Sequence, residues 1–166
     1  CMRGDLTRTD FQWRVVTYLK RQDVTVIWSS PPCQPYALAG RHTPGDPRCE
    51  VAKACADIAC RVQVPAFVLE NVLAMSTSKK NPVLREYIIP KMRKHGYHIT
   101  LARSDACRSG IPNRRRRLFM VATKYPRAKS LQKRMEVLRL QPDTCLNTYL
   151  PGPVGQLVLT PRHSRS

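Results

Sequence analysis

The stretch VTVIWSSPPCQPYALAG, residues 24–40, sets the main expectation for the fold. Its first five residues are apolar, β-branched or aromatic, which predicts a strand over 24–30 that ends at the Pro-Pro pair. The proline-rich loop that follows fixes Cys33 directly after this strand. A thiolate is a good nucleophile, and a rigid loop can hold it ready for attack. The alternative is a buried cysteine with a purely structural role.

Helices alternate with strands along the rest of the chain. Apolar spacing and turn residues predict helices over 9–22, 48–64 and 81–96, and strands over 24–30, 66–72, 98–103 and 117–123. Thr9 is the predicted N-cap of the first helix, and Pro90 is expected to kink the third. This order predicts an α/β fold with a parallel sheet, in which the last two strands form a reversal at the sheet edge. The pattern decays after residue 125, so we expect an irregular basic segment over 126–166.

Charge is the strongest feature of the composition. The chain has 29 Lys and Arg against 11 Asp and Glu, a net charge of +18. Such an excess attracts a polyanion, and nucleic acid is the commonest one. Seven cysteines, an odd number with no C-x-x-C pair, indicate a reduced intracellular chain and no zinc site. The apolar runs are too short for a membrane span, so no membrane partner is expected.

Two more motifs stand next to predicted strand ends. Glu70 closes the run AFVLENV, where an acid can hand a proton to a substrate, although it can equally pair with an arginine. Four arginines in GIPNRRRRLFMVA (110–122) precede the last strand, and alternation places Arg115 and Arg117 on one face. Their guanidinium forks suit phosphates and base edges; the alternative is a solvated basic turn. Loops beyond strand carboxyl ends share one crevice, so we expect Cys33 and Glu70 to face each other there.

Taken in order, the motifs resemble the cytosine-5 DNA methyltransferase family. The matching blocks are RGDL (3–6), PPCQPYALAG followed by DPR (46–48), ENV (70–72), and GIPNRRRRLFMVA, with Asn113 where the family has glutamine. The resemblance covers roughly residues 3–123. It implies a Rossmann-like S-adenosylmethionine-dependent methyltransferase sheet and a partial catalytic domain over 1–125. The fold is expected to be incomplete, with the N-terminal strands and the target-recognition region missing.

The resemblance also implies a role for each matching residue. Cys33 would attack carbon 6 of cytosine, Glu70 would protonate or hydrogen-bond ring nitrogen 3, and Arg117, supported by Arg115, would hold the carbonyl oxygen of the base. Asp5 and Leu6 would contact the adenine of S-adenosylmethionine, and no metal is implied. The remaining substrate-binding residues would be Pro32, Gln34, Asn71 and Arg48.

DNA is the partner that the resemblance implies, with transfer RNA as the alternative because GIPN resembles the branch that acts on it. The implied location is the nucleus in a eukaryote or the cytoplasm in a bacterium, and the oligomeric state stays open. A second alternative is a non-catalytic basic nucleic-acid-binding remnant. The family's glycine-rich turn is not in this sequence, so we expect the chain alone to be inactive or nearly so.

Overall fold

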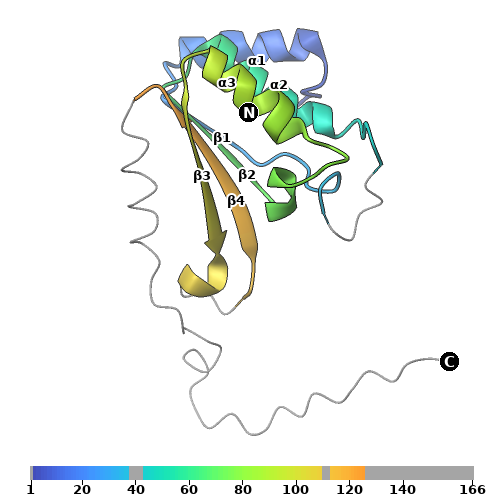
Figure 1. Ribbon diagram of the computed structural model, residues 1–166. Helices are drawn as coiled ribbons and strands as arrows, with labels where there is room; N and C mark the ends of the chain where they lie inside the picture. The colour runs from blue at the N-terminus through green and yellow to red at the C-terminus, as the bar shows by residue number, and fades with distance from the viewer. Residues whose placement is uncertain (1, 38–42, 110–112, 126–166) are drawn as a thin grey trace, which may run out of the picture.

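The computed structural model describes residues 2–37, 43–109 and 113–125 (Figure 1). The elements are α1 (Thr9–Arg21), β1 (Val26–Ser29), α2 (Cys49–Val62), β2 (Ala66–Asn71), a 3-10 turn (Leu73–Ser76), a π turn (Leu84–Ile88), α3 (Ile89–Lys94), β3 (His98–Asp105), a second 3-10 turn (Ala106–Ser109) and β4 (Arg116–Thr123). This confirms the predicted order of helices and strands. The segment 126–166, expected to be irregular and basic, lies outside the described residues.

The four strands form one sheet in the order β1-β2-β4-β3. β1 and β2 are parallel, while β4 runs antiparallel to both of its neighbours. The predicted reversal is present, but β4 lies inside the sheet and β3 lies at the edge. The burial patterns give the reason: alternate residues of β4, namely Leu118, Met120 and Ala122, are fully buried. A strand with such a buried stripe is stabilised by neighbours on both sides, whereas β3 exposes His98 and Leu101.

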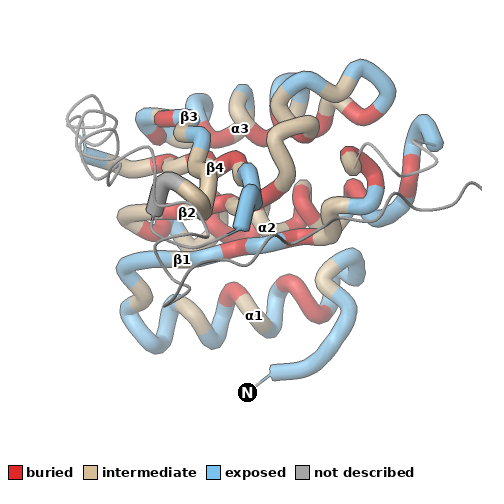
Figure 2. Tube along the Cα trace, turned by 90° about the horizontal axis from the view of Figure 1, so that it is seen from below, coloured by how far each residue is buried: buried red, intermediate tan, exposed pale blue. Residues whose placement is uncertain are grey.

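One face of the sheet carries the core. Phe67 and Leu69 of β2 pack with the buried stripe of β4 against α2, the π turn and α3. The small residues Ala52, Ala56 and Ala59 let α2 approach the sheet closely. Figure 2 shows buried residues gathered on these elements and few along α1. The other face is more open: Trp28 of β1 is 63% exposed and meets the Phe119 ring in an edge-on arrangement, with 5.8 Å between ring centroids.

Two helix ends differ from expectation for local reasons. Arg8, and not Thr9, is the N-cap of α1, because the preceding turn is closed by the Asp5 carboxylate, which accepts hydrogen bonds from Thr7. The predicted third helix begins as a π turn before Pro90 and continues as the short α3. Proline lacks an amide hydrogen, so a widened turn before it is a common accommodation. Gly96 ends this helix with φ +78°, as its glycine predicts.

Within the described ranges, no helix has the length and apolar character that crossing a membrane requires. In the same ranges, His, Cys, Asp and Glu side chains do not gather in a group of three that could hold a metal ion.

Candidate active site

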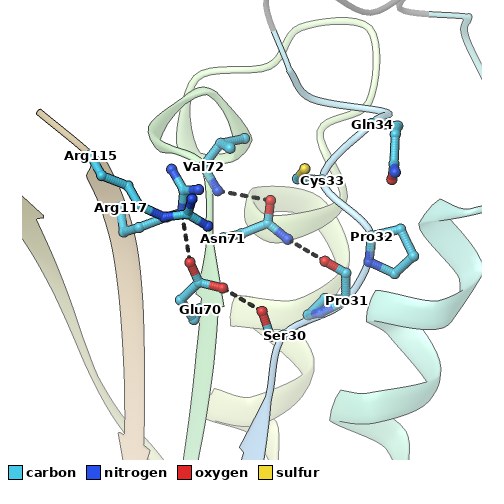
Figure 3. A pocket seen from close by; sticks show the side chains of 10 residues that line it. All are labelled: Ser30, Pro31, Pro32, Cys33, Gln34, Glu70, Asn71, Val72, Arg115 and Arg117. Carbon is cyan, nitrogen blue, oxygen red and sulfur yellow. Dashed lines mark hydrogen bonds and ion pairs between the residues drawn. The ribbon is translucent and has the colours of Figure 1, made fainter. Parts of the chain in front are cut away.

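A cavity of about 340 Å³ opens at the carboxyl ends of β1 and β2, beside the start of β4. Figure 3 shows side chains from three separate segments of the chain turned toward it. A volume of this size falls in the range of small-molecule sites and is large enough for a single flat heterocycle. The lining residues are Ser30, Pro31, Pro32, Cys33, Gln34, Glu70, Asn71, Val72, Arg115 and Arg117.

Cys33 is the first residue of a tight turn. The amide groups of Tyr36 and Ala37 both donate to the Cys33 carbonyl oxygen, each at 2.9 Å. Tyr36 is 1% exposed and anchors the turn in the core, where burial raises the pKa of its hydroxyl above the ordinary value. The thiol of Cys33 is half-buried and free. The loop therefore presents a reduced sulfur to the cavity, and its backbone is held by the turn hydrogen bonds and by the buried Tyr36.

Asn71, which follows Glu70 at the end of β2, ties this loop to the sheet. It is buried, and its Nδ2 donates to the Pro31 carbonyl oxygen at 3.0 Å. Its Oδ1 accepts a hydrogen bond from the Val72 amide at 2.9 Å. A buried side-chain amide with both ends bonded fixes the distance between the segments that it joins. Asn71 thus sets how far the Cys33 loop lies from the end of β2.

Glu70 combines both of the expectations for it, since it faces the cavity and also pairs with an arginine. Its Oε1 lies 2.8 Å from Nε of Arg117, in a pair whose side chains are 19% and 23% exposed respectively. The Ser30 hydroxyl donates to the other carboxylate oxygen. A carboxylate has about four lone-pair sites, so it can still accept a hydrogen bond from a ligand. Ser30 is a residue that sequence reasoning missed, although its position right after β1 could have indicated it.

The arginine run alternates as predicted. Arg115 and Arg117 line the cavity, whereas Arg116 points elsewhere and pairs with Asp105 at 3.4 Å. Nη1 of Arg117 donates to the Arg116 carbonyl oxygen at 2.9 Å, so Arg117 is held at both ends of its guanidinium. Arg115 is exposed and lies one residue before β4. The cavity therefore has one fixed guanidinium and one that extends into solvent.

Three of the predicted site residues lie outside this cavity. Arg48 grips Asp46 through Nε and Nη2, at 3.0 and 2.6 Å, and this contact holds the pKa of Asp46 below its ordinary value. The pair braces the start of α2. Asp5 is an exposed turn residue whose pKa is lowered by the hydrogen bonds from Thr7. The backbone carbonyl oxygen of Leu6 accepts a hydrogen bond from Gln12 at 2.8 Å.

The remaining predicted residues come together at the cavity. Pro32 and Gln34 are the chain neighbours of Cys33, and Asn71 lies between the Cys33 loop and Arg117 (Figure 3). The arrangement offers a nucleophilic sulfur, a carboxylate and a guanidinium to one bound molecule. Pro31 and Val72 also line the cavity; both lie within the matching blocks PPCQPYALAG and ENV, but neither was assigned a role of its own.

Comparison with known families gives a match over nearly the whole chain. The model for the C-5 cytosine-specific DNA methylase family matches residues 3–150. The Type II methyltransferase M.HindV of Haemophilus influenzae is 31% identical over 106 residues, which cover 64% of this chain and 34% of that protein. The Type II methyltransferase M.AplI of Arthrospira platensis is 30% identical over 141 residues, covering 82% of this chain and 39% of that protein. The chain thus spans only about a third of the length of these relatives.

Solved structures agree on the fold. The Entamoeba histolytica methyltransferase EhMeth superposes with a TM-score of 0.60 at 24% identity, over 75% of this chain and 38% of that one. A putative DNA modification methyltransferase from a prophage of E. coli gives a TM-score of 0.57 at 21% identity, over 78% and 34%. Identities this low speak for the fold alone. The sheet is the open, Rossmann-like sheet of methyltransferases.

Proposed function

The chain belongs to the C-5 cytosine-specific DNA methylase family, and we propose that it handles the target base in a reaction that methylates carbon 5 of cytosine in DNA. One observation carries the proposal: Cys33, Glu70 and Arg117 come from three separate strand ends and line one cavity that is large enough for a single base. The catalytic part would be residues 1–125. It would work inside the cell, in the nucleus of a eukaryote or the cytoplasm of a bacterium.

The chemistry begins with addition of the Cys33 thiolate to carbon 6 of the ring. As the sulfur–carbon bond forms, the π pair of the carbon 5–carbon 6 bond moves to the carbon 4–carbon 5 bond. Ring nitrogen 3 takes up the displaced pair together with a proton that it shares with Glu70. Arg117 holds Glu70 in place and is suited to bind the carbonyl oxygen of the base, with Arg115 in support. Carbon 5 has then become the nucleophilic carbon of an enamine.

Methyl transfer needs a donor, and S-adenosylmethionine is the one we expect. When bound, it supplies the methyl group that carbon 5 takes up. Asp5 fits as a contact for the amino group of its adenine, because Thr7 holds the exposed carboxylate in place and its lowered pKa keeps it an acceptor. Leu6, beside it, offers an apolar side chain. Water then takes the proton from carbon 5, the proton on ring nitrogen 3 returns to Glu70, and the aromatic ring is restored as the bond from carbon 6 to the Cys33 sulfur breaks and the thiolate leaves.

The target base must leave the stack to be reached. Addition to carbon 6 needs access to the face of the ring, and stacked neighbours cover both faces in a duplex. The wall opposite Cys33 is lined by arginine, and the whole chain carries a net charge of +18, which favours contact with the phosphate backbone. We therefore propose DNA as the partner, with Pro32, Gln34 and Asn71 shaping the pocket for the flipped base and Arg48 supporting the loop from outside the cavity.

The test uses a cytosine analogue without the 4-amino group, 2-pyrimidinone, placed in random sequence contexts in duplex DNA. The analogue adds thiolates at carbon 6 readily and needs no methyl donor, so the chain can be assayed as it is. We expect a covalent complex whose adduct maps to the peptide that contains Cys33. Cys33→Ser should abolish it, whereas Cys107→Ser, which changes another half-buried cysteine, should leave it unchanged.

Two other results would redirect the proposal. Faster trapping by the same analogue in transfer RNA would make RNA the substrate. Tight, salt-dependent binding of DNA with no adduct, equal for the parent chain and Cys33→Ser, would identify a non-catalytic nucleic-acid-binding remnant.

A further inference from the structure

Asn81 lies outside every motif described above, yet it is attached to the Cys33 loop. It sits in the linker between the first 3-10 turn and the π turn and is 3% exposed. Its Nδ2 donates to the carbonyl oxygen of Pro35 at 3.0 Å and to that of Thr43 at 3.2 Å. Both hydrogens of one side-chain amide are thus used on the backbone of a segment about 40 residues away in the sequence.

The two carbonyl groups belong to the two arms of the loop that carries Cys33. Pro35 lies two residues after the cysteine, and Thr43 lies on the arm that returns toward α2. One nitrogen atom therefore holds the outgoing and the returning arm together. On the other side of the cysteine, Asn71 holds Pro31 at 3.0 Å. Cys33 is centred between two proline carbonyls, each bonded to a buried asparagine.

Asn81 is itself fixed from two directions. Its backbone amide donates to the Ser78 hydroxyl at 3.1 Å. Pro82 follows it and restricts the backbone of the residue before a proline to extended conformations. The backbone that carries the side-chain amide is therefore fixed independently of its bonds to Pro35 and Thr43. This is what a group that sets the geometry of a neighbouring segment requires.

We infer that Asn81 is a positioning residue for the Cys33 nucleophile. It acts through Pro35 and Thr43 and does not touch the base, and this role rests on the proposed function of Cys33. This position requires asparagine, because one side-chain nitrogen must donate two hydrogen bonds to two carbonyl oxygens. Aspartate has the same shape but would set carboxylate oxygens against two carbonyl oxygens, and serine could donate to only one of them.

The experiment compares Asn81→Asp and Asn81→Ser with the parent chain. The rate of adduct formation with 2-pyrimidinone DNA is measured at saturating DNA, and hydrogen exchange is followed at the Tyr36 and Ala37 amides. We expect Asn81→Asp to slow the adduct rate by roughly 10- to 100-fold, since a small misplacement of a reacting group has effects on that order. Asn81→Ser should show a smaller loss. The apparent Kd for DNA should change little in both, and amide exchange in the Cys33 turn should become faster.

Tyr97→Phe is the matched control. The Tyr97 hydroxyl is also buried and also contacts two backbone carbonyl oxygens, those of Ala59 at 3.2 Å and Val64 at 2.7 Å, but it lies away from the cavity. Its loss should leave both the adduct rate and the exchange of the Cys33 turn unchanged. A general loosening of the fold would instead affect the control and the Asn81 variants alike.

Folded Asn81→Asp and Asn81→Ser chains that react at the parental rate, with parental exchange at Tyr36 and Ala37, would overturn the inference. So would an equal slowing in Tyr97→Phe. Failure of the proposed function looks different, because the parent chain then forms no adduct at all. In that case alkylation of Cys33 by iodoacetamide, together with exchange in the turn, still decides whether Asn81 positions the thiol.

Discussion

The Cys33 loop and the arginine arm, residues 113–117, reach the same cavity in opposite ways. The loop is held at the Pro31 and Pro35 carbonyl groups by buried asparagines and at Tyr36 by the core. The arm is exposed from Asn113 to Arg116, and Arg116 stays 66% exposed in its pair with Asp105, whereas Arg117 is 23% exposed in its ion pair with Glu70. One region is fixed before any ligand arrives, and the other keeps most of its charge in water.

The difference matches the chemistry that each region is proposed to perform. Covalent addition depends on distance and angle, so a nucleophile gains from a backbone that needs no rearrangement. Recognition of a base edge or a phosphate by charge tolerates a moving side chain better, because the electrostatic energy between two charges decreases slowly with their distance. Glu70 joins the two regions: one of its oxygens meets Arg117 of the arm, and the other meets Ser30, just before the loop.

Among the substitutions compared in this section, Glu70→Gln is expected to have the largest effect, because it replaces the carboxylate that contacts both Arg117 and Ser30. The amide cannot hand over a proton to ring nitrogen 3, and it loses the ion pair with Arg117. The rate of adduct formation with 2-pyrimidinone DNA should fall by about 10²- to 10⁴-fold, the range of general acid–base contributions. Glu86→Gln, at an exposed glutamate of the π turn, is the control and should react at the parental rate. Equal rates in the two variants would remove Glu70 from the mechanism.

The next prediction compares how much substitutions beside the Cys33 loop and on the arginine arm lower the free energy of unfolding. Asn71→Ala removes a buried amide and leaves the Pro31 carbonyl group and the Val72 amide without their partner. The free energy of unfolding in urea should fall by about 1–3 kcal/mol. Arg115→Ala, on the exposed arm, should change it by less than about 0.5 kcal/mol. If both substitutions cost the same, the contrast between a fixed loop and a solvated arm is wrong.

A smaller effect is expected for Arg117→Lys. Lysine keeps the charge but cannot contact both Glu70 and the Arg116 carbonyl group with a planar fork. The adduct rate should drop by roughly tenfold, the equivalent of about 1.4 kcal/mol. Arg114→Lys, which changes a neighbouring arginine outside the cavity, should react normally. A normal rate for Arg117→Lys would mean that charge alone suffices at this position.

The smallest effect concerns the outer side of the arm. Arg114 is exposed and lies outside the cavity, so any contact that it makes with DNA is expected at a phosphate. Arg114→Ala should weaken binding evenly across DNA sequences. It should also lower the slope of log K against log salt by about one. Fluorescence anisotropy at several salt concentrations measures this, and an unchanged slope would place the phosphate contacts elsewhere.

Sequence reasoning succeeded where the information is local. The run 24–30, the apolar spacing of 48–64 and the alternation of Arg115 and Arg117 each depend on residues close together in the chain, and the structure agrees with them. The shared cavity of Cys33 and Glu70 followed from a general rule about strand ends.

The features that the sequence did not predict depend on contacts between residues that are distant in the chain, or on a neighbouring side chain that pairs with the predicted residue. β4 lies between β2 and β3, and this order depends on how the strands pack together in the folded sheet. The local sequence of each strand does not contain that information. Asn81 is bonded to carbonyl groups about 40 residues away, and no spacing pattern reports such a contact. Arg48 was expected at the substrate, but it does not line the cavity, and its Nε and Nη2 contact the buried Asp46 two residues earlier.

The most direct test is a crystal structure of the chain joined to a duplex with 2-pyrimidinone at one position. We expect a flipped base in the cavity, a bond from Sγ of Cys33 to carbon 6, and hydrogen bonds from Glu70 and Arg117 to that same ring. A base that remains stacked in the duplex, with Cys33 unbonded and the arginines on phosphates alone, would contradict it.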